Sequence, residues 1–142
     1  MPRQAAVANL QKQQQEPQVT THQYQQASEH FLAQARQELA DADLPQASEK
    51  GWGATAQILK AVAEQRGWDH SRHRHHLVTV SRLRAETGAG DIRRLFNTAS
   101  ALHENFYENT MQTFEVAEGL DDVEALMDKL IPLLSQTESR PL

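Results

Sequence analysis

The sequence predicts an all-α protein, folded as an up-and-down antiparallel bundle of four to five helices. Apolar residues recur along most of the chain at steps of three and four residues, the spacing that places them on one face of a helix. No segment sustains the alternation of apolar and polar residues that is typical of a half-buried strand. Five prolines and six glycines among 142 residues are also too few for a chain of short strands and tight turns. Short links between helices favour antiparallel neighbours.

The first two helices are predicted over about residues 21–41 and 43–66. The apolar face of the first consists of Tyr24, Ala27, Phe31, Ala35 and Leu39. The second opens with Pro45 at a position that a helix start tolerates, and Gly67 ends it. Its apolar face consists of Ala47, Gly51, Ala54, Ile58, Ala61 and Val62. Because many of these residues are small, a neighbouring helix can approach closely.

The third and fourth helices are predicted on either side of Gly88. The third covers about residues 71–87, with an inward arc of His73, His76, Leu77, Val80 and Leu83. The fourth begins after Gly90, and Asp91 is its expected N-cap. Its apolar face is the most regular in the chain and consists of Ile92, Leu95, Phe96, Ala99, Leu102, Phe106 and Thr110.

The last helix is predicted to follow Gly119, with Asp121 or Asp122 as its cap. Its inward face consists of Val123, Leu126, Met127, Leu130 and Leu134. Pro132 falls near its end, where a proline bends or finishes a helix.

A single domain accounts for the length of the chain. Residues 1–19 are rich in glutamine and poor in large apolar residues, which predicts a flexible tail, followed by the bundle over 20–136 and a flexible C-terminus over 137–142. The chain has no cysteine, which excludes disulfides, a thiol nucleophile and Cys-ligated metals. It has no apolar stretch near the ~20 residues of a membrane span and no secretion signal. We therefore expect a cytoplasmic protein with no membrane partner and no cofactor.

Charge is unevenly distributed along this acidic chain, whose formal net charge is -5. Residues 66–94 contain seven arginines and three acids, whereas residues 104–128 contain eight acids and no lysine or arginine. The basic segment has the charge to attract nucleic acid. The alternative is that the two segments neutralise each other, within one chain or between subunits.

Four histidines crowd into residues 70–76, and His73 and His76 share a helical face. Histidine clusters bind zinc or nickel when a third ligand completes the set. Only Asp69 offers a carboxylate nearby. We therefore favour a solvated cationic segment over a metal site here.

Two further segments carry candidate binding residues. In the segment 46–55, Gly51 and Gly53 flank Trp52, which is expected near the helix surface, and the glycines indicate close packing. In the segment 101–109, His103 lies beside the apolar face and needs a polar partner, for which Glu49 is our choice. The candidate ligand-binding residues are Glu49, Lys50, Trp52, Arg93, Arg94, His103, Asn105, Tyr107 and Glu108, and His103 is the candidate catalytic residue.

These two segments, Ala47-Ser-Glu-Lys-Gly-Trp-Gly-Ala54 and Ala101-Leu-His-Glu-Asn-Phe-Tyr-Glu108, resemble the PaREP family of small all-helical archaeal proteins. That family in turn resembles the HEPN group of nucleotide-binding proteins. The likeness covers about residues 24–134. It implies an HEPN-like helical bundle that often dimerises and binds RNA or nucleotides. It also implies a place in a toxin–antitoxin or defence module, beside a nucleotidyltransferase-like protein partner.

Ribonucleases of the HEPN group carry an arginine four to six residues before a histidine on a late helix. In this chain, Phe96, Asn97 and Thr98 occupy those positions before His103. The sequence therefore favours a non-catalytic module that binds a nucleotide, RNA or a protein. The alternatives are a metal-independent ribonuclease that uses His103 with an arginine from elsewhere, and a purely structural oligomer. The segregated charges predict a homodimer that loosens with salt, held mainly by apolar contacts.

Overall fold

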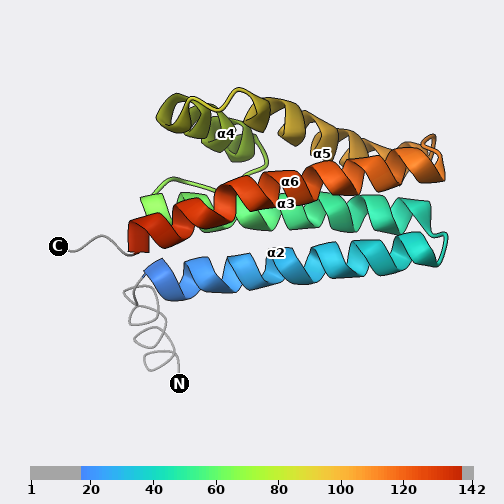
Figure 1. Ribbon diagram of the computed structural model, residues 1–142, viewed down its shortest axis with the longest axis horizontal. Helices are drawn as coiled ribbons and strands as arrows, with labels where there is room; N and C mark the ends of the chain where they lie inside the picture. Colours follow the sequence, from blue (N-terminus) through green and yellow to red (C-terminus); the bar gives the residue numbers. More distant parts are fainter. Residues whose placement is uncertain (1–16, 139–142) are drawn as a thin grey trace, which may run out of the picture.

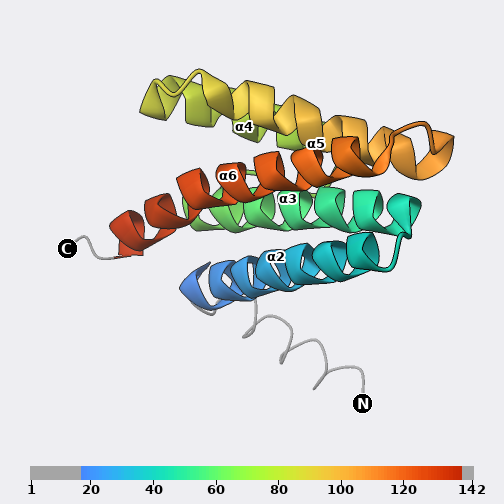
Figure 2. The same ribbon diagram turned by 45° about the vertical axis from the view of Figure 1, so that its right-hand side comes forward.

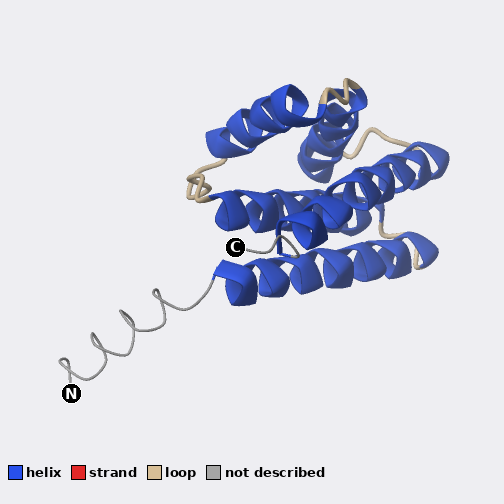
Figure 3. Cartoon of the chain, turned by 60° about the vertical axis from the view of Figure 1, so that its left-hand side comes forward, coloured by secondary structure: helices blue, strands red, loops and turns tan. Residues whose placement is uncertain are grey.

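The computed structural model of the chain describes residues 17–138, which form five helices and no strand (Figure 3). They are α2 (Pro17–Ala40), α3 (Leu44–Arg66), α4 (Arg74–Thr87), α5 (Asp91–Glu108) and α6 (Thr113–Glu138). The predicted all-α class is confirmed. Most of the predicted tail, residues 1–16, and the final residues 139–142 lie outside the described part. The first helix of the described residues, α2, begins at Pro17, four residues before the expected start at Thr21.

Helix α3 is the centre of the bundle, because it contacts each of the other four helices. In Figures 1 and 2, α2 lies on one side of α3 and α6, whereas α4 and α5 lie on the other. Along the chain, α2, α3, α5 and α6 alternate in direction, as in an up-and-down bundle (Figure 1). Helix α4 is added on the outside, where it packs against α3 and α5.

The tightest packing in the core surrounds Leu102 of α5. A Cβ atom on Gly51 of α3 would lie 2.6 Å from Leu120 Cδ2 and 3.1 Å from Leu102 Cδ1. A Cβ atom on Gly119 of α6 would lie 2.8 Å from Leu102 Cδ2. Glycine at these two positions therefore lets α3, α5 and α6 approach one another, as the small residues of α3 predict.

The ends of α3 match the expectations from the sequence. The Asp43 side chain accepts a hydrogen bond from the Gln46 backbone N–H at 3.1 Å and so caps the first turn, with Pro45 beside it. Gly67 and Gly88 close α3 and α4 in left-handed conformations, each with φ of 73°. Glycine adopts this conformation without the steric cost that a Cβ atom brings.

The start of α6 was predicted too late. The helix begins at Thr113, so Gly119 lies inside it and serves the contact with Leu102. Asp121 and Asp122 are consequently not caps. Asp121 pairs with Arg36 of α2 at 3.0 Å, and Asp122 accepts a hydrogen bond from Thr98 at 3.1 Å.

Two further helix signals were misread. Pro132 is exposed and does not stop α6, which continues to Glu138. Asp91 does not cap α5, because its side chain pairs with Lys129 of α6 at 2.8 Å instead. The hydrogen bond from Lys129 lowers the pKa of Asp91 below its ordinary value.

The predicted faces of α4 and α5 need correction at four positions. His73 precedes α4 and is exposed, and Leu77 is 41% exposed, because α4 turns a narrow face inward. That buried face consists of His76, Thr79, Val80 and Leu83. On α5 the buried face continues to Asn105, while Phe106 is only partly buried and Thr110 lies beyond the helix. Between residues 17 and 138, no helix combines the length and apolar character that a membrane crossing requires.

Candidate functional site

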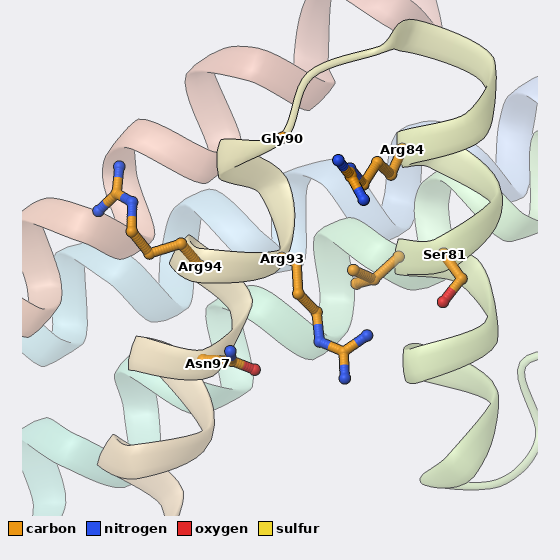
Figure 4. Close-up of a pocket in the computed structure, with 7 residues that line it drawn as sticks. Ser81, Arg84, Gly90, Arg93, Arg94 and Asn97 are labelled. Atoms are coloured by element: carbon orange, nitrogen blue, oxygen red, sulfur yellow. The ribbon is translucent and has the colours of Figure 1, made fainter.

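The first candidate site is a cavity of about 490 Å³ between the outer sides of α4 and α5, here called the arginine pocket. Its lining residues are Val80, Ser81, Arg84, Gly90, Arg93, Arg94 and Asn97. Figure 4 shows the guanidinium groups of Arg84 and Arg93 in the gap between the two helices, whereas Arg94 extends from the other side of α5. The volume is in the range of small-molecule sites.

Apolar contacts on the opposite faces of the two helices place these arginines. Leu83 is fully buried on α4, and Ile92 and Phe96 are almost fully buried on α5. With those residues turned into the core, the neighbouring positions turn outward toward the gap between the helices. Arg84 reaches the start of α5, where its Nη2 atom would lie 3.8 Å from a Cβ atom on Gly90.

Two arginines outside this pocket, Arg36 and Arg66, have acidic partners, whereas the arginines of the pocket have none among residues 20–134, as is also the case for Arg72, Arg74 and Arg82. Arg66 binds Glu86 through two hydrogen bonds, of 3.1 and 2.6 Å, and Arg36 pairs with two acids of α6. Among residues 20–134, whose side chains the structure describes, no ion pair involves Arg84, Arg93 or Arg94. Guanidinium groups bind phosphate and carboxylate groups through paired N–H donors. The pocket is thus equipped to hold an anion.

The second candidate site surrounds Trp52 of α3, at the point where the beginning of α4 packs against it. The centroid of its ring lies 5.1 Å from that of His73 and 5.1 Å from that of His103. Because the two imidazole centroids are 5.8 Å apart, both rings lie on the same side of the indole. His76 approaches the indole edge-on at 5.9 Å. We call these four residues the histidine–tryptophan cluster.

Glu49 orients His103 within this cluster. His103 Nδ1 lies 3.1 and 3.2 Å from the two carboxylate oxygens of Glu49, as expected from the sequence. Since a carboxylate only accepts, Nδ1 is the donor in this contact. About one third of each side chain is exposed. The arrangement fixes the His103 imidazole beside a second imidazole, that of His73.

Comparison with known proteins gives one decisive finding. The model of the archaeal PaREP1/PaREP8 family matches residues 23–127 of the chain. The chain belongs to the PaREP1/PaREP8 family. Comparisons with curated proteins and with solved structures found no match. The match spans both candidate sites, since Glu49, Arg93 and His103 all lie inside it.

The structure of this PaREP1/PaREP8 protein distributes the predicted site residues over several places. Glu49, Trp52 and His103 come together, and Tyr107 meets His103 edge-on at a centroid distance of 5.7 Å. Trp52 is buried, with 7% of its surface exposed, and not near the helix surface as predicted. Its neighbours on α4 and α5, which the helix pattern of α3 alone does not reveal, cover it.

The remaining candidates are engaged elsewhere. Lys50 forms an ion pair of 2.8 Å with Glu38 of α2. Asn105 is buried and structural, because its side chain donates to Ser48 and accepts from the Thr110 and Met111 backbone N–H groups. Glu108 lines a separate cavity of about 180 Å³ together with Glu104 and Asn105. These residues are therefore not part of either candidate site.

The histidine run divides between several partners. His70 contacts Glu64 at 2.7 Å, His75 lies 3.6 Å from Asp69, and the other two histidines face Trp52. Within residues 17–138, no group of three or more histidines, aspartates or glutamates is arranged to hold a metal ion.

Reasoning from the sequence missed Ser81, Arg84 and Asn97 as pocket residues. The four-residue steps from Val80 to Arg84 and from Arg93 to Asn97 place each pair on one side of its helix. These steps can be read from the sequence. The packing of α4 against α5, which joins the two pairs into one pocket, cannot. The same packing brings His73 and His76 to Trp52.

Proposed function

We propose that this PaREP1/PaREP8 protein is a binding module that holds the phosphate groups of a nucleotide or an RNA strand in the arginine pocket. The observation that carries the proposal is the convergence of Arg84 and Arg93 on one cavity, with no acidic partner among the described residues. Guanidinium groups bind phosphate, as they bind carboxylate, through two parallel N–H donors. The neighbouring Ser81 and Asn97 add neutral hydrogen-bonding groups.

The test is the affinity of Arg84→Gln/Arg93→Gln for inorganic phosphate, a nucleoside monophosphate and a ten-residue RNA without a terminal phosphate. Hydrogen bonds to charged groups contribute about 1.5–3 kcal/mol each, so we expect at least tenfold weaker binding. Arg36→Gln removes the same charge from an arginine that is already paired with α6 and serves as the control.

The three ligands separate the two sources of phosphate. Much tighter binding of the RNA than of the monophosphate identifies a strand as the ligand, and equal binding identifies a nucleotide. Equal affinities of the wild type and the double variant for every ligand would refute the proposal.

A second candidate function, a metal-independent ribonuclease, is favoured by the Glu49–His103 pair. The hydrogen-bond and ring partners of His103 among the described residues are Glu49, Trp52, His73 and Tyr107, and none is an arginine. His73 therefore takes the place of the arginine expected as its helper. Cleavage of a mixed RNA pool in the presence of a chelator, abolished in His103→Ala, would support this candidate. Absence of cleavage would leave the binding module.

Self-association is the third part of the proposal. The pocket arginines are positively charged, whereas the exposed acids of α5 and α6 are negatively charged. In a two-fold dimer, the basic surface of each subunit can contact the acidic surface of the other, so the contact forms twice. Trp52 is too buried to contribute, but Tyr107 and Phe114 are 71% and 58% exposed. We expect light scattering at micromolar concentration to give twice the 16.0 kDa chain mass, with a dimer that loosens as salt is added. A mass of one chain at low salt would contradict this.

A further inference from the structure

Helix α4 forms one wall of the arginine pocket, and four buried residues and the contact of Glu86 with Arg66 of α3 hold it to the bundle. It supplies Val80, Ser81 and Arg84 to the pocket, and it packs only against α3 and α5 within the described chain. Its buried residues are His76, Thr79, Val80 and Leu83. One of these four residues, His76, is titratable. A change in its charge therefore changes how strongly the whole helix is held to the bundle.

The surroundings of His76 accept only the neutral imidazole. The residue is 5% exposed, its ring meets the edge of Trp52, and its Nδ1 atom is buried with no hydrogen-bond partner. A protonated imidazole carries a hydrogen on both nitrogens, so protonation would bury an N–H group that nothing accepts. This cost disappears when α4 moves away from α3 and the ring meets water.

The charged groups near His76 act in the same direction. His73, Lys60, His70 and His75 each disfavour a positive charge there. The one carboxylate at the cluster, Glu49, is bound to His103. Burial, reinforced by these neighbours, lowers the pKa of His76 from 6.5 to about 4.

We propose that His76 is a positioning residue whose protonation releases α4 from Trp52 and thereby opens the arginine pocket. The proposal rests on the function proposed above, since the pocket is the site that it regulates. A histidine whose pKa is lower when docked stabilises docking fully above its free pKa, and this contribution is lost as the pH falls toward the docked pKa. The sensitive range is therefore between pH 6.5 and pH 4.

Hydrogen exchange of residues 74–87 tests the release of α4 without any ligand. We expect the protection factors of α4, corrected for the intrinsic exchange rates, to fall on the order of tenfold between pH 7.5 and pH 5, while those of α3 and α6 change little. His76→Leu should remove this dependence, because leucine fills the buried position without a titratable group. His30→Leu, which removes an exposed histidine of α2, should behave as the wild type. Equal pH dependence of α4 in the wild type and in His76→Leu would overturn the proposal.

The affinity for the same ten-residue RNA tests the link to the pocket. Its phosphodiesters keep their charge between pH 7.5 and pH 5, and protonation of exposed histidines by itself strengthens binding in acid. Release of α4 opposes that trend. At pH 5 we therefore expect the wild type to bind the RNA severalfold more weakly than His76→Leu does. At pH 7.5 we expect the two proteins to bind it equally. Equal affinities of the two proteins at pH 5 would contradict regulation of the pocket. If Arg84→Gln/Arg93→Gln binds as the wild type, the proposed function fails instead, whatever the exchange data show.

Discussion

Arg36 on the side of α2 and the pocket arginines on the side of α4 and α5 differ in their partners. On the side of α2, Arg36 pairs with Asp121 and Glu124 of α6, and Lys50 of α3 pairs with Glu38. On the side of α4 and α5, Arg84 and Arg93 share a cavity and have no acidic partner among the described residues. Arg36 and Lys50 are engaged in the fold, whereas the pocket arginines are available to a ligand, although the same side also holds the ion pairs Arg66–Glu86 and Lys129–Asp91. The unpaired arginines of the pocket, and not the total charge, are therefore the groups that we propose to bind the ligand.

The largest effect is expected on stability, from Leu102→Ala in the core on the side of α4 and α5. Leu102 is fully buried against two glycines of α3 and α6, so its truncation leaves a cavity at the centre of the core. We expect the free energy of unfolding to fall by about 2–5 kcal/mol in denaturant titrations. The control Leu77→Ala, on the exposed face of α4, should change it by less than about 0.5 kcal/mol. Similar losses for both variants would show that α4 belongs to the same tightly packed core.

A smaller effect is expected from Asp43→Ala, which removes the N-cap of α3. Loss of such a cap typically costs about 1 kcal/mol of stability. Asp91→Ala at the start of α5 should cost less, because its side chain caps no backbone group and pairs with Lys129 in an exposed position. Thermal unfolding of the two variants in parallel compares the two helix starts directly. A larger loss of stability in Asp91→Ala than in Asp43→Ala would contradict this expectation.

The smallest effect is expected from Lys50→Met. The Lys50–Glu38 pair is partly exposed, and such pairs contribute about 0–1 kcal/mol. Because this lysine is engaged in the fold, we also expect its removal to leave RNA affinity unchanged within twofold. A clear loss of RNA binding would extend the ligand site to the side of α2 and remove the contrast between the two sides.

Local signals in the sequence were sufficient to predict most of the fold. The periodic apolar residues identify five helices, and Asp43, Gly67 and Gly88 mark helix ends because the conformation at each depends on neighbouring residues alone. Gly119 was misread because its role is a close approach to Leu102, far away in the sequence. A glycine that ends a helix and one that admits a neighbouring helix look alike until the packing is known.

The candidate sites were predicted in part for the same reason. A half-buried His103 needs a polar partner, and Glu49 is our choice because the two segments that resemble the family would then meet; the structure confirms the pairing. The position of α4 did not follow, because only four of its residues are buried and its predicted inward face included the exposed Leu77. Without that position, Arg84 could not be joined to Arg93, nor His73 and His76 to Trp52.

The salt dependence of RNA binding tests the central claim most directly. Each phosphate that a single strand contributes to binding adds about 0.7 to the slope of log affinity against log salt concentration. If Arg84 and Arg93 each bind one phosphate, the slope for the ten-residue RNA should be smaller by about 1.4 in Arg84→Gln/Arg93→Gln than in the wild type, and unchanged in Arg36→Gln. Equal slopes in all three proteins would contradict the claim that the unpaired arginines of the pocket are the phosphate-binding groups.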